Sequence, residues 1–402
     1  MIFIYLLSIV SCSNNNDISQ ENNTDTSESP STETYSYPIV DTGVFAFYSD
    51  INTISSPSNK DAFFGQDATY SGSQPSYTNN GDGTITDNIT GLQWEQDMGT
   101  KITFTDAITK ATNSTLGNYI DWRVPTLKEL YSLILFTGQV KGEVAIDFFI
   151  DINYFSQPLG DTSIGEREID AQTWSSTEYV GLTMNADATV FGVNFIDGRI
   201  KGYPKYKPGS GAANTMYFRM VRGNTDYGKN NFVDNNDGTI SDLATGLMWQ
   251  KADDEISRNW EESLAYAEEL SLGNKSDWRL PNAKELQSIA DYTRSPQTTN
   301  SPAINPLFEC SEITDTNGNK NYPFYWTGTS HLDGANPYSS AVYIAFGEGQ
   351  GEMSGVLMDV HGAGCQRSDP KSGNINDYPQ FFGPQGDVRY VYNYVRCVRT
   401  IN

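Results

Sequence analysis

The feature that most constrains this chain of 402 residues is a long internal repeat. Three motifs in the first half return in the same order about 155 residues later. They are Gly-Asp-Gly-Thr at 81–84 and Asn-Asp-Gly-Thr at 236–239, Thr-Gly-Leu-Gln-Trp at 90–94 and Thr-Gly-Leu-Met-Trp at 245–249, and Asp-Trp-Arg-Val-Pro at 121–125 and Asp-Trp-Arg-Leu-Pro at 277–281. A period this long holds a whole globular domain. We therefore expect two tandem domains, at residues 38–226 (the first copy) and 227–402 (the second copy).

Each copy shows the pattern of two helices followed by short strands. Asn259 and Glu262 form a capping box in front of an apolar stripe that starts at Trp260 and repeats at i+4 and i+7. A second helix is predicted after Pro281 and, in the first copy, after Pro125, each with Glu three residues beyond its cap. Asp-Gly-Thr predicts a hairpin turn, and short aromatic strands follow the helices. This order predicts an α+β fold, with an insertion of about 26 residues before the last strand of the second copy.

The repeated motifs, together with Arg-Met-Val-Arg at 219–222 and Arg-Cys-Val-Arg at 396–399, resemble the Lcl C-terminal domain family. The resemblance covers both copies, from about residue 37 to the C-terminus. It implies two C-type lectin-like domains, each with two helices and a compact, loop-rich antiparallel sheet. Because related folds include sugar- and protein-binding domains and formylglycine-generating enzymes, it implies surface recognition and leaves a catalytic domain as the alternative. The chain is acidic and lacks collagen repeats, so binding of sulfated glycans is not carried over.

The N-terminus predicts export and lipid anchoring. Residues 1–10 are almost wholly apolar but too short to span the roughly 30 Å of a membrane core as a helix. Ile-Val-Ser-Cys at 9–12 resembles a bacterial lipobox, so we expect residues 1–12 to be a signal peptide with lipidation at Cys12. Residues 13–37 carry acids and no basic residue and predict a disordered tether. These features place the protein at the bacterial cell envelope, on the outer membrane or the cell surface.

The net charge bears on partners. With 50 Asp and Glu against 26 Lys and Arg, the chain has a formal charge of −24. Such a charge repels phosphate backbones, which excludes nucleic acid as a partner.

The repeated Asp-Trp-Arg motif allows two interpretations. One is a ligand-binding Trp/Arg pair, and the other is a structural motif with Trp in the core and Arg held by Asp or by Glu129 and Glu285. We favour the structural interpretation, because a motif repeated with the fold need not be a site. Its members are Asp121, Trp122, Arg123, Asp277, Trp278 and Arg279.

Metal and cofactor sites are not predicted. The acidic run around Asp237 has no Glu at the twelfth position of an EF-hand loop. His361 and Cys365 stand four residues apart with Gly, Ala and Gly between them, which favours a turn over a catalytic pair or a metal half-site.

The cysteines suggest one disulfide. Apart from Cys12, the chain holds Cys310, Cys365 and Cys397, all in the second copy. In an oxidising compartment we expect one disulfide and one free thiol, with Cys365–Cys397 as the first pairing and the two pairings of Cys310 still open.

One basic cluster is a candidate for ligand binding, namely Lys201, Tyr203, Lys205, Tyr206 and Lys207. The tyrosines could stack on a glycan while the lysines meet its anionic groups, although a solvated hairpin loop is the simpler interpretation. The expected function is non-catalytic recognition of an extracellular glycan or protein, adhesion included, without a cofactor. A structural lipoprotein in an envelope assembly is the other alternative.

Overall fold

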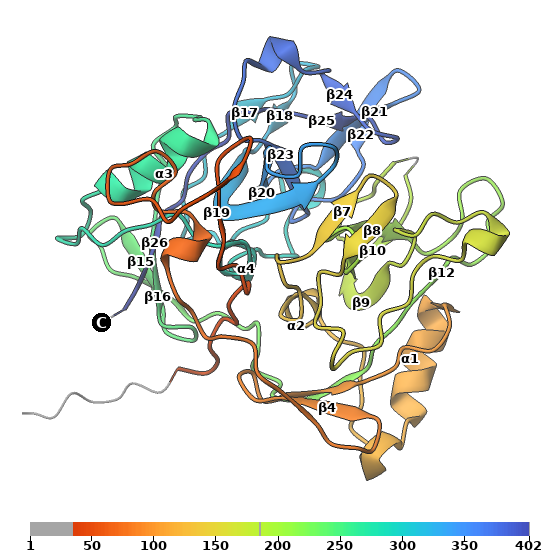
Figure 1. Ribbon diagram of the computed structural model, residues 1–402. Coiled ribbons are helices and arrows are strands. Elements are labelled where there is room, and N and C mark those ends of the chain that lie inside the picture. Colours follow the sequence, from red (N-terminus) through yellow and green to blue (C-terminus); the bar gives the residue numbers. More distant parts are fainter. Residues whose placement is uncertain (1–34, 185, 402) are drawn as a thin grey trace, which may run out of the picture. The chain divides into compact units, whose positions relative to one another are not determined.

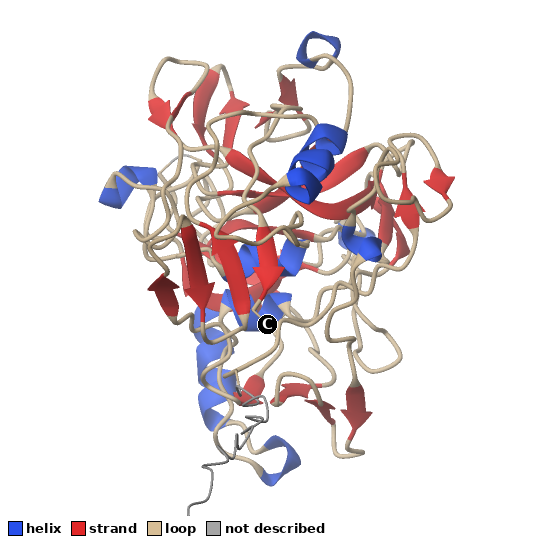
Figure 2. Ribbon diagram, turned by 90° about the vertical axis from the view of Figure 1, so that its left-hand side faces the viewer, coloured by secondary structure: helices blue, strands red, loops and turns tan. Residues whose placement is uncertain are grey.

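The computed structural model describes residues 35–184 and 186–401, and Tyr35–Asn402 form one compact unit. Few helices and many short strands are joined by long loops (Figure 2), which confirms the α+β class. The signal peptide, Cys12 and residues 13–34 of the tether lie outside the described residues. Tyr37, expected at the end of the tether, is buried. Within the described ranges, no helix has the length and apolar character needed to cross a membrane.

Each copy has a four-stranded antiparallel sheet that combines three early strands with the last strand of the copy (Figure 1). In the first copy the order is β13-β5-β4-β3, with β3 (Tyr77–Asn79), β4 (Thr84–Asp87), β5 (Leu92–Glu95) and β13 (Val221–Gly223). In the second copy it is β14-β15-β16-β26, with β14 (Phe232–Asp234), β15 (Thr239–Asp242), β16 (Leu247–Gln250) and β26 (Val398–Thr400). Gly83 and Gly238 take φ of 87° and 88° in the turns before β4 and β15, the conformation that the Asp-Gly-Thr motif predicts.

The helices follow their caps. They are α1 (Phe104–Asn113) and α2 (Leu127–Tyr131) in the first copy, and α3 (Trp260–Glu269), α4 (Ala283–Ser288) and the short α5 (Pro296–Thr299) in the second. Capping boxes open α2, α3 and α4, with Glu129, Glu262 and Glu285 bonded back to the cap backbone. The predicted helix starts are therefore confirmed, because short-range hydrogen bonds decide them.

The two copies share one eight-stranded sheet, in the order β8-β7-β19-β20-β23-β11-β10-β9. The first copy supplies β7 (Gln139–Lys141), β8 (Val144–Asp147), β9 (Thr173–Glu178), β10 (Thr189–Asn194) and β11 (Arg199–Pro204), and the second supplies β19 (Phe324–Asp333), β20 (Ser340–Ala345) and β23 (Gln366–Pro370). The copies join at two places, where Ile200 of β11 pairs antiparallel with Gln366 of β23 and where β7 pairs in parallel with β19. The sequence predicts two separate domains, whereas the described chain interlocks the copies through this sheet.

Two segments of the second copy, before and after β23, build a further sheet, ordered β22-β21-β25-β24, from β21 (Gln350–Met353), β22 (Val356–Asp359), β24 (Phe381–Phe382) and β25 (Asp387–Val388). Three two-stranded ribbons complete the described strands: β1 (Phe47–Tyr48) with β2 (Thr53–Ile54), β6 (Ile102–Thr103) with β12 (Thr215–Met216), and β17 (Ile313–Thr314) with β18 (Lys320–Asn321).

Two lysines in equivalent positions tie α2 and α4 together. Lys128 Nζ donates to the carbonyl of Ser288 at 2.6 Å, and Lys284 Nζ donates to the carbonyl of Ser132 at 2.8 Å. Each lysine therefore binds the end of the helix in the other copy. Burial lowers the pKa of Lys128 to about 8 and that of Lys284 to about 7.

Residues 35–73, the N-terminal arm, contact the first copy, where Phe136 N–H donates to the carbonyl of Thr42, and also pack on the second copy. The carboxylate of Asp67 accepts hydrogen bonds from Thr329 Oγ1 at 2.6 Å and from Thr42 Oγ1 at 2.7 Å. Lys371 Nζ donates to the carbonyl of Ser49 at 2.9 Å. Burial raises the pKa of Asp67 to about 7, although the two hydroxyl donors oppose this. The arm thus joins the core through polar contacts with buried partners.

Asp67 should make stability depend on pH. The folded state holds the Asp67 proton up to about pH 7, while the unfolded chain releases it near the ordinary value of 3.8. Stability contributed by Asp67 therefore falls as the pH rises through this window. We expect the difference in free energy of unfolding, wild type minus Asp67→Asn, to decrease between about pH 4 and pH 7 and then level off, as measured by urea unfolding. A difference that stays constant with pH would contradict this assignment.

Candidate functional site

A polar cavity of about 200 Å³ lies over the shared sheet, where β11, β20 and β23 meet the inserted segment. Its lining includes three guanidinium and three carboxylate side chains, from Arg199, Arg367, Arg389, Asp333, Asp369 and Asp387. In a chain with a charge of −24, this balanced lining is a local exception. Oppositely charged groups around one cavity offer both donors and acceptors to a polar ligand.

One wall of the cavity is an ionic network around Asp387. Arg367 and His361 both bind this carboxylate, with His361 Nε2 at 2.8 Å from Asp387 Oδ1. Burial opposes ionisation of Asp387, but Arg367 and His361 outweigh it and hold its pKa below the usual range. Burial also lowers the pKa of His361 to about 4, so that the imidazole is neutral and donates from Nε2.

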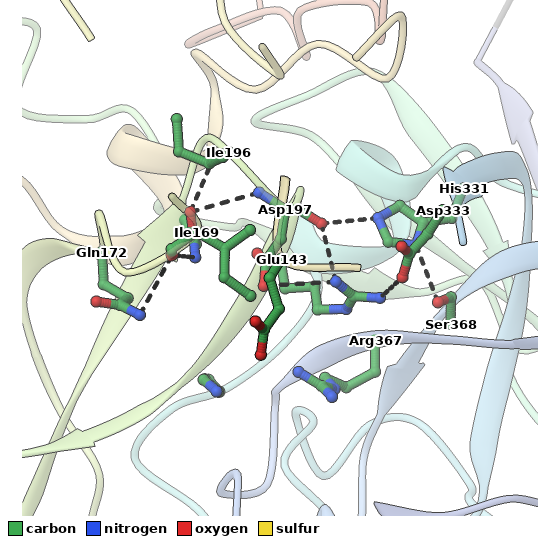
Figure 3. A network of polar contacts seen from close by, with 12 residues as sticks. Glu143, Ile169, Gln172, Ile196, Asp197, His331, Asp333, Arg367 and Ser368 are labelled. Carbon is green, nitrogen blue, oxygen red and sulfur yellow. Dashed lines mark hydrogen bonds and ion pairs between the residues drawn. The ribbon is translucent and has the colours of Figure 1, made fainter. Parts of the chain in front are cut away.

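A second network holds Arg199 at the other side of the cavity. Its guanidinium binds Asp333 and lies 3.4 Å from Asp197 Oδ2. His331 bonds through Nε2 to the carbonyl of Asp197 and through Nδ1 to Ser368 Oγ, both at 2.9 Å, as Figure 3 shows. Burial lowers the pKa of His331 to about 3, so the neutral ring donates from Nε2 and accepts at Nδ1. These contacts hold Arg199 in place, although Asp197 Oδ1 and Arg199 Nε are buried without a hydrogen-bond partner among the described residues.

Arg389 differs from the other two arginines. Its guanidinium lies 3.4 Å from the centroid of the Phe382 ring and 5.8 Å from that of Tyr378. Among the described residues it has no hydrogen-bond or ion-pair partner. Phe382 is half exposed, at 50%. A stacked cation with free donors beside an exposed ring is a surface that a ligand can complete.

The basic cluster predicted as a ligand site does not gather on one surface. Lys201 is largely enclosed, donates to Gln385 Oε1 at 3.0 Å, and lies 5.4 Å above the buried ring of Tyr203. Lys205 pairs with Glu178 at 2.6 Å. Only Tyr206 and Lys207 are exposed and outside such contacts. Residues 199–204 form strand β11 of the shared sheet, where a solvated loop was expected, and Lys205, Tyr206 and Lys207 follow the strand.

The Asp-Trp-Arg motifs take part in the core of both copies. The ring nitrogens of Trp122 and Trp278 donate to the carbonyls of Leu116 and Leu272, and both rings are buried. The arginines form two-pronged ion pairs with glutamates of the capping boxes, Arg123 with Glu129 and Arg279 with Glu285. The aspartates instead bind the closing arginines, Asp121 with Arg222 and Asp277 with Arg399.

The expected disulfide is wrong for the described cysteines, since Cys310, Cys365 and Cys397 are all free thiols. Cys365 and Cys397 pack in one hydrophobic cluster and Cys310 beside another, where Cys310 Sγ lies 3.1 Å from Tyr325 OH. Burial raises the pKa of Cys310 to about 12 and raises those of the other two thiols further.

His361 and Cys365 do not form a pair. His361 Nε2 is bound to Asp387, and Nδ1 has no hydrogen-bond partner among the described residues. The same ranges contain no group of three or more His, Cys, Asp and Glu side chains arranged to hold a metal ion. Around Asp237, the carboxylate accepts from the backbone and hydroxyl of Thr239, as in an ordinary turn.

Sequence reasoning missed the residues of the inserted segment, above all Phe382, Asp387 and Arg389. They lie outside the repeat, so no matching position in the first copy marks them. The available signal was the segment itself, because an insertion with an aromatic pair followed by Asp and Arg is unusual for a simple loop.

The fold and this cavity define a duplicated α+β protein with a polar cavity beside the junction of its halves. The chain belongs to the Lcl C-terminal domain family, whose family model matches residues 83–222 and 238–359, more than half of the chain. Comparisons with curated proteins and with solved structures gave no match.

Arg279 should be a stability residue. Its side chain is 13% exposed and that of Glu285 is 8% exposed, so Arg279→Ala leaves a buried carboxylate without its partner. We expect a loss of about 3 kcal/mol in the free energy of unfolding, measured with urea. Arg167→Ala is the control, because its pair with Asp170 is more exposed, at 37% and 25%, and should cost less than about 1 kcal/mol. An Arg279→Ala protein of wild-type stability that loses only ligand binding would restore the ligand-binding interpretation.

Cys310, Cys365 and Cys397 should be detectable as three free thiols. Protein purified without reductant and carrying Cys12→Ser should react slowly with a thiol reagent when folded, because burial keeps all three groups protonated. In denaturant it should release three thiols per chain, measured by absorbance. Fewer than three, with a cross-linked peptide found by mass spectrometry, would show that a disulfide forms.

Proposed function

We propose that this protein recognises a carbohydrate without chemical conversion, through the cavity over the shared sheet. The observation that carries the proposal is Arg389, which lines the cavity stacked on Phe382 with its hydrogen-bond donors free among the described residues. A sugar ring presents an apolar face and a rim of hydroxyls. Phe382 suits the face, and the guanidinium and carboxylate groups suit the hydroxyls.

The size and rigidity of the cavity support a small polar ligand. About 200 Å³ accommodates about one sugar unit, below the range of typical drug-sized pockets. The Arg367–Asp387 and Arg199–Asp333 pairs hold their positions before any ligand arrives. Preorganised groups lose little freedom on binding, which favours recognition.

The state of the reactive side chains supports binding rather than catalysis. Burial raises the pKa of each cysteine, which is the opposite of an activated thiolate. Both histidines are buried and neutral, with pKa lowered by burial, and His361 is held by Asp387. A formylglycine-generating activity would need reactive cysteines, so we do not favour that alternative.

The predicted location at the cell envelope is consistent with a role in recognition. A lipid at Cys12 and an acidic tether would hold the C-type lectin-like domains at the outer membrane or cell surface, where they meet extracellular glycans or proteins. In this proposal the membrane is a partner only through the anchor, and adhesion is the cellular consequence.

The cavity residues should control binding. We expect a panel of neutral and acidic oligosaccharides to contain a ligand whose affinity falls about tenfold or more with Arg389→Ala or Phe382→Ala, measured by calorimetry. Both side chains are partly exposed, so the melting temperature should change little. Lys207→Ala is the matched control, because Lys207 is exposed and does not line the cavity. Loss of binding with Lys207→Ala but not with Arg389→Ala would move the site to the basic cluster, and failure of every glycan would contradict the proposal.

A further inference from the structure

The two copies carry the same surface in two different states. In each copy a threonine of the sheet accepts the first backbone N–H of a helix, Thr177 from Leu127 at 2.9 Å and Thr329 from Ala283 at 3.0 Å. The residue before each threonine donates its N–H to the proline that precedes the helix cap. The Arg123–Glu129 pair lies beside Thr177, and the Arg279–Glu285 pair lies beside Thr329. The two surfaces are therefore built from equivalent residues.

In the second copy the N-terminal arm covers this surface. The arm makes one 3₁₀ turn, Asp67–Thr69, directly over Thr329. Thr329 Oγ1 donates its proton to the Asp67 carboxylate at 2.6 Å, and the ring of Tyr70 lies 5.2 Å from the Arg279 guanidinium. Two side chains therefore hold the arm on this surface, the carboxylate of Asp67 and, three residues later, the aromatic ring of Tyr70.

In the first copy the same surface is open. A groove of about 470 Å³ runs over Arg123, Thr126, Glu129, Ser176, Thr177 and Lys229. The Arg123 side chain is 30% exposed against 13% for Arg279, and Ser176 is exposed where Gly328 is buried. Residues 225 and 227–229 of the segment between the copies line one side of the groove, and no described residue accepts a hydrogen bond from Thr177 Oγ1 as Asp67 does from Thr329.

The open groove has free donors where the arm supplies acceptors. Among the described residues, the hydroxyl proton of Thr177 has no acceptor, whereas the equivalent proton of Thr329 goes to Asp67. No described aromatic ring covers the Arg123 guanidinium. Lys229 at the rim adds positive charge, and its exposed pair with Asp226 holds it only weakly. The groove is thus complementary to a carboxylate followed by an aromatic ring.

We propose that the groove of the first copy docks a polypeptide segment from a partner protein, one that carries a carboxylate side chain and an aromatic side chain three residues later in a single helical turn. The segment binds as the arm binds the second copy, with the carboxylate on Thr177 and the ring over Arg123. This site is separate from the proposed carbohydrate cavity and does not depend on it.

One difference between the copies sets the fit. A Cβ at Gly328 would lie 3.1 Å from the backbone nitrogen of Asp67, and the first copy has Ser176 in that place. A docked segment must therefore sit a few tenths of an ångström farther out than the arm does, so binding is weaker than a perfect copy of the arm contact would give. Position 176 is exposed, so changing it tests docking without disturbing the core.

The experiment uses the full chain and a labelled peptide with the sequence of residues 62–73, followed by fluorescence anisotropy. The covalently attached arm keeps its own site occupied through its high effective concentration, so added peptide reports on the open groove. We expect saturable binding that tightens with Ser176→Gly and is lost with Ser176→Trp. In the peptide, Asp67→Asn should weaken binding about tenfold, as expected for loss of a charged hydrogen bond. Thr177→Val in the protein should act in the same direction.

Two control variants test whether the peptide binds only at the groove. Ser210→Trp places the same bulky ring on an exposed loop outside the groove and should leave peptide binding unchanged. Arg389→Ala should also leave it unchanged, which distinguishes failure here from failure of the carbohydrate proposal. Absence of saturable peptide binding would overturn the docking site. So would binding insensitive to Ser176→Trp, or an acidic oligosaccharide that binds the groove with this sensitivity when the peptide does not.

Discussion

The structure depends on two buried lysines that exchange partners across the junction of the repeats. Lys128 and Lys284 each bring an ammonium group into the interior, and each finds a carbonyl acceptor at the end of the helix in the other copy. A buried ammonium without acceptors costs several kcal/mol, so the carbonyl groups of the other copy are what allow the two lysines to lie in the interior. The sheet reinforces this constraint, because β11 and β23 are inner strands only while both copies are present. The two copies therefore form one compact unit.

The sequence predicted the features that depend on hydrogen bonds between residues close together in the chain. Capping boxes fix the starts of α2, α3 and α4, and Asp-Gly-Thr fixes the turns before β4 and β15, since each needs only neighbouring residues. The Arg279–Glu285 pair spans six residues and is similarly local. The pairing of Ile200 with Gln366 joins residues 166 positions apart, and no pattern within either strand specifies that partner. The arm on the second copy belongs to the same class, because polar residues such as Asp67 and Ser49 resemble a linker until their buried partners are known.

The candidate site was hard to predict for a related reason. Lys201 and Tyr203 lie on β11, where Gln385 of the inserted segment contacts Lys201, whereas Lys205 and Lys207 lie beyond the end of the strand, so a run that looks basic in the sequence does not form one surface. Cys365 and Cys397 lie in one apolar cluster and Cys310 lies beside another. Burial there favours the neutral thiol over the charged thiolate. Arg389 and Phe382 come from the segment that breaks the repeat. Residues that follow the repeat mostly build the fold, and the residues that depart from it supply the pocket.

The exchange between Lys128 and Lys284 has a further consequence. Reciprocal contacts, in which one residue binds a site and its counterpart binds the matching site, are the geometry by which two identical chains associate about a two-fold axis. In a pair of separate chains such an interface forms and dissociates by mass action. Within one chain it is independent of dilution, and the two faces no longer have to remain identical. An arm can settle on one face and an insertion can grow in one half, while the opposite face stays available to the surroundings.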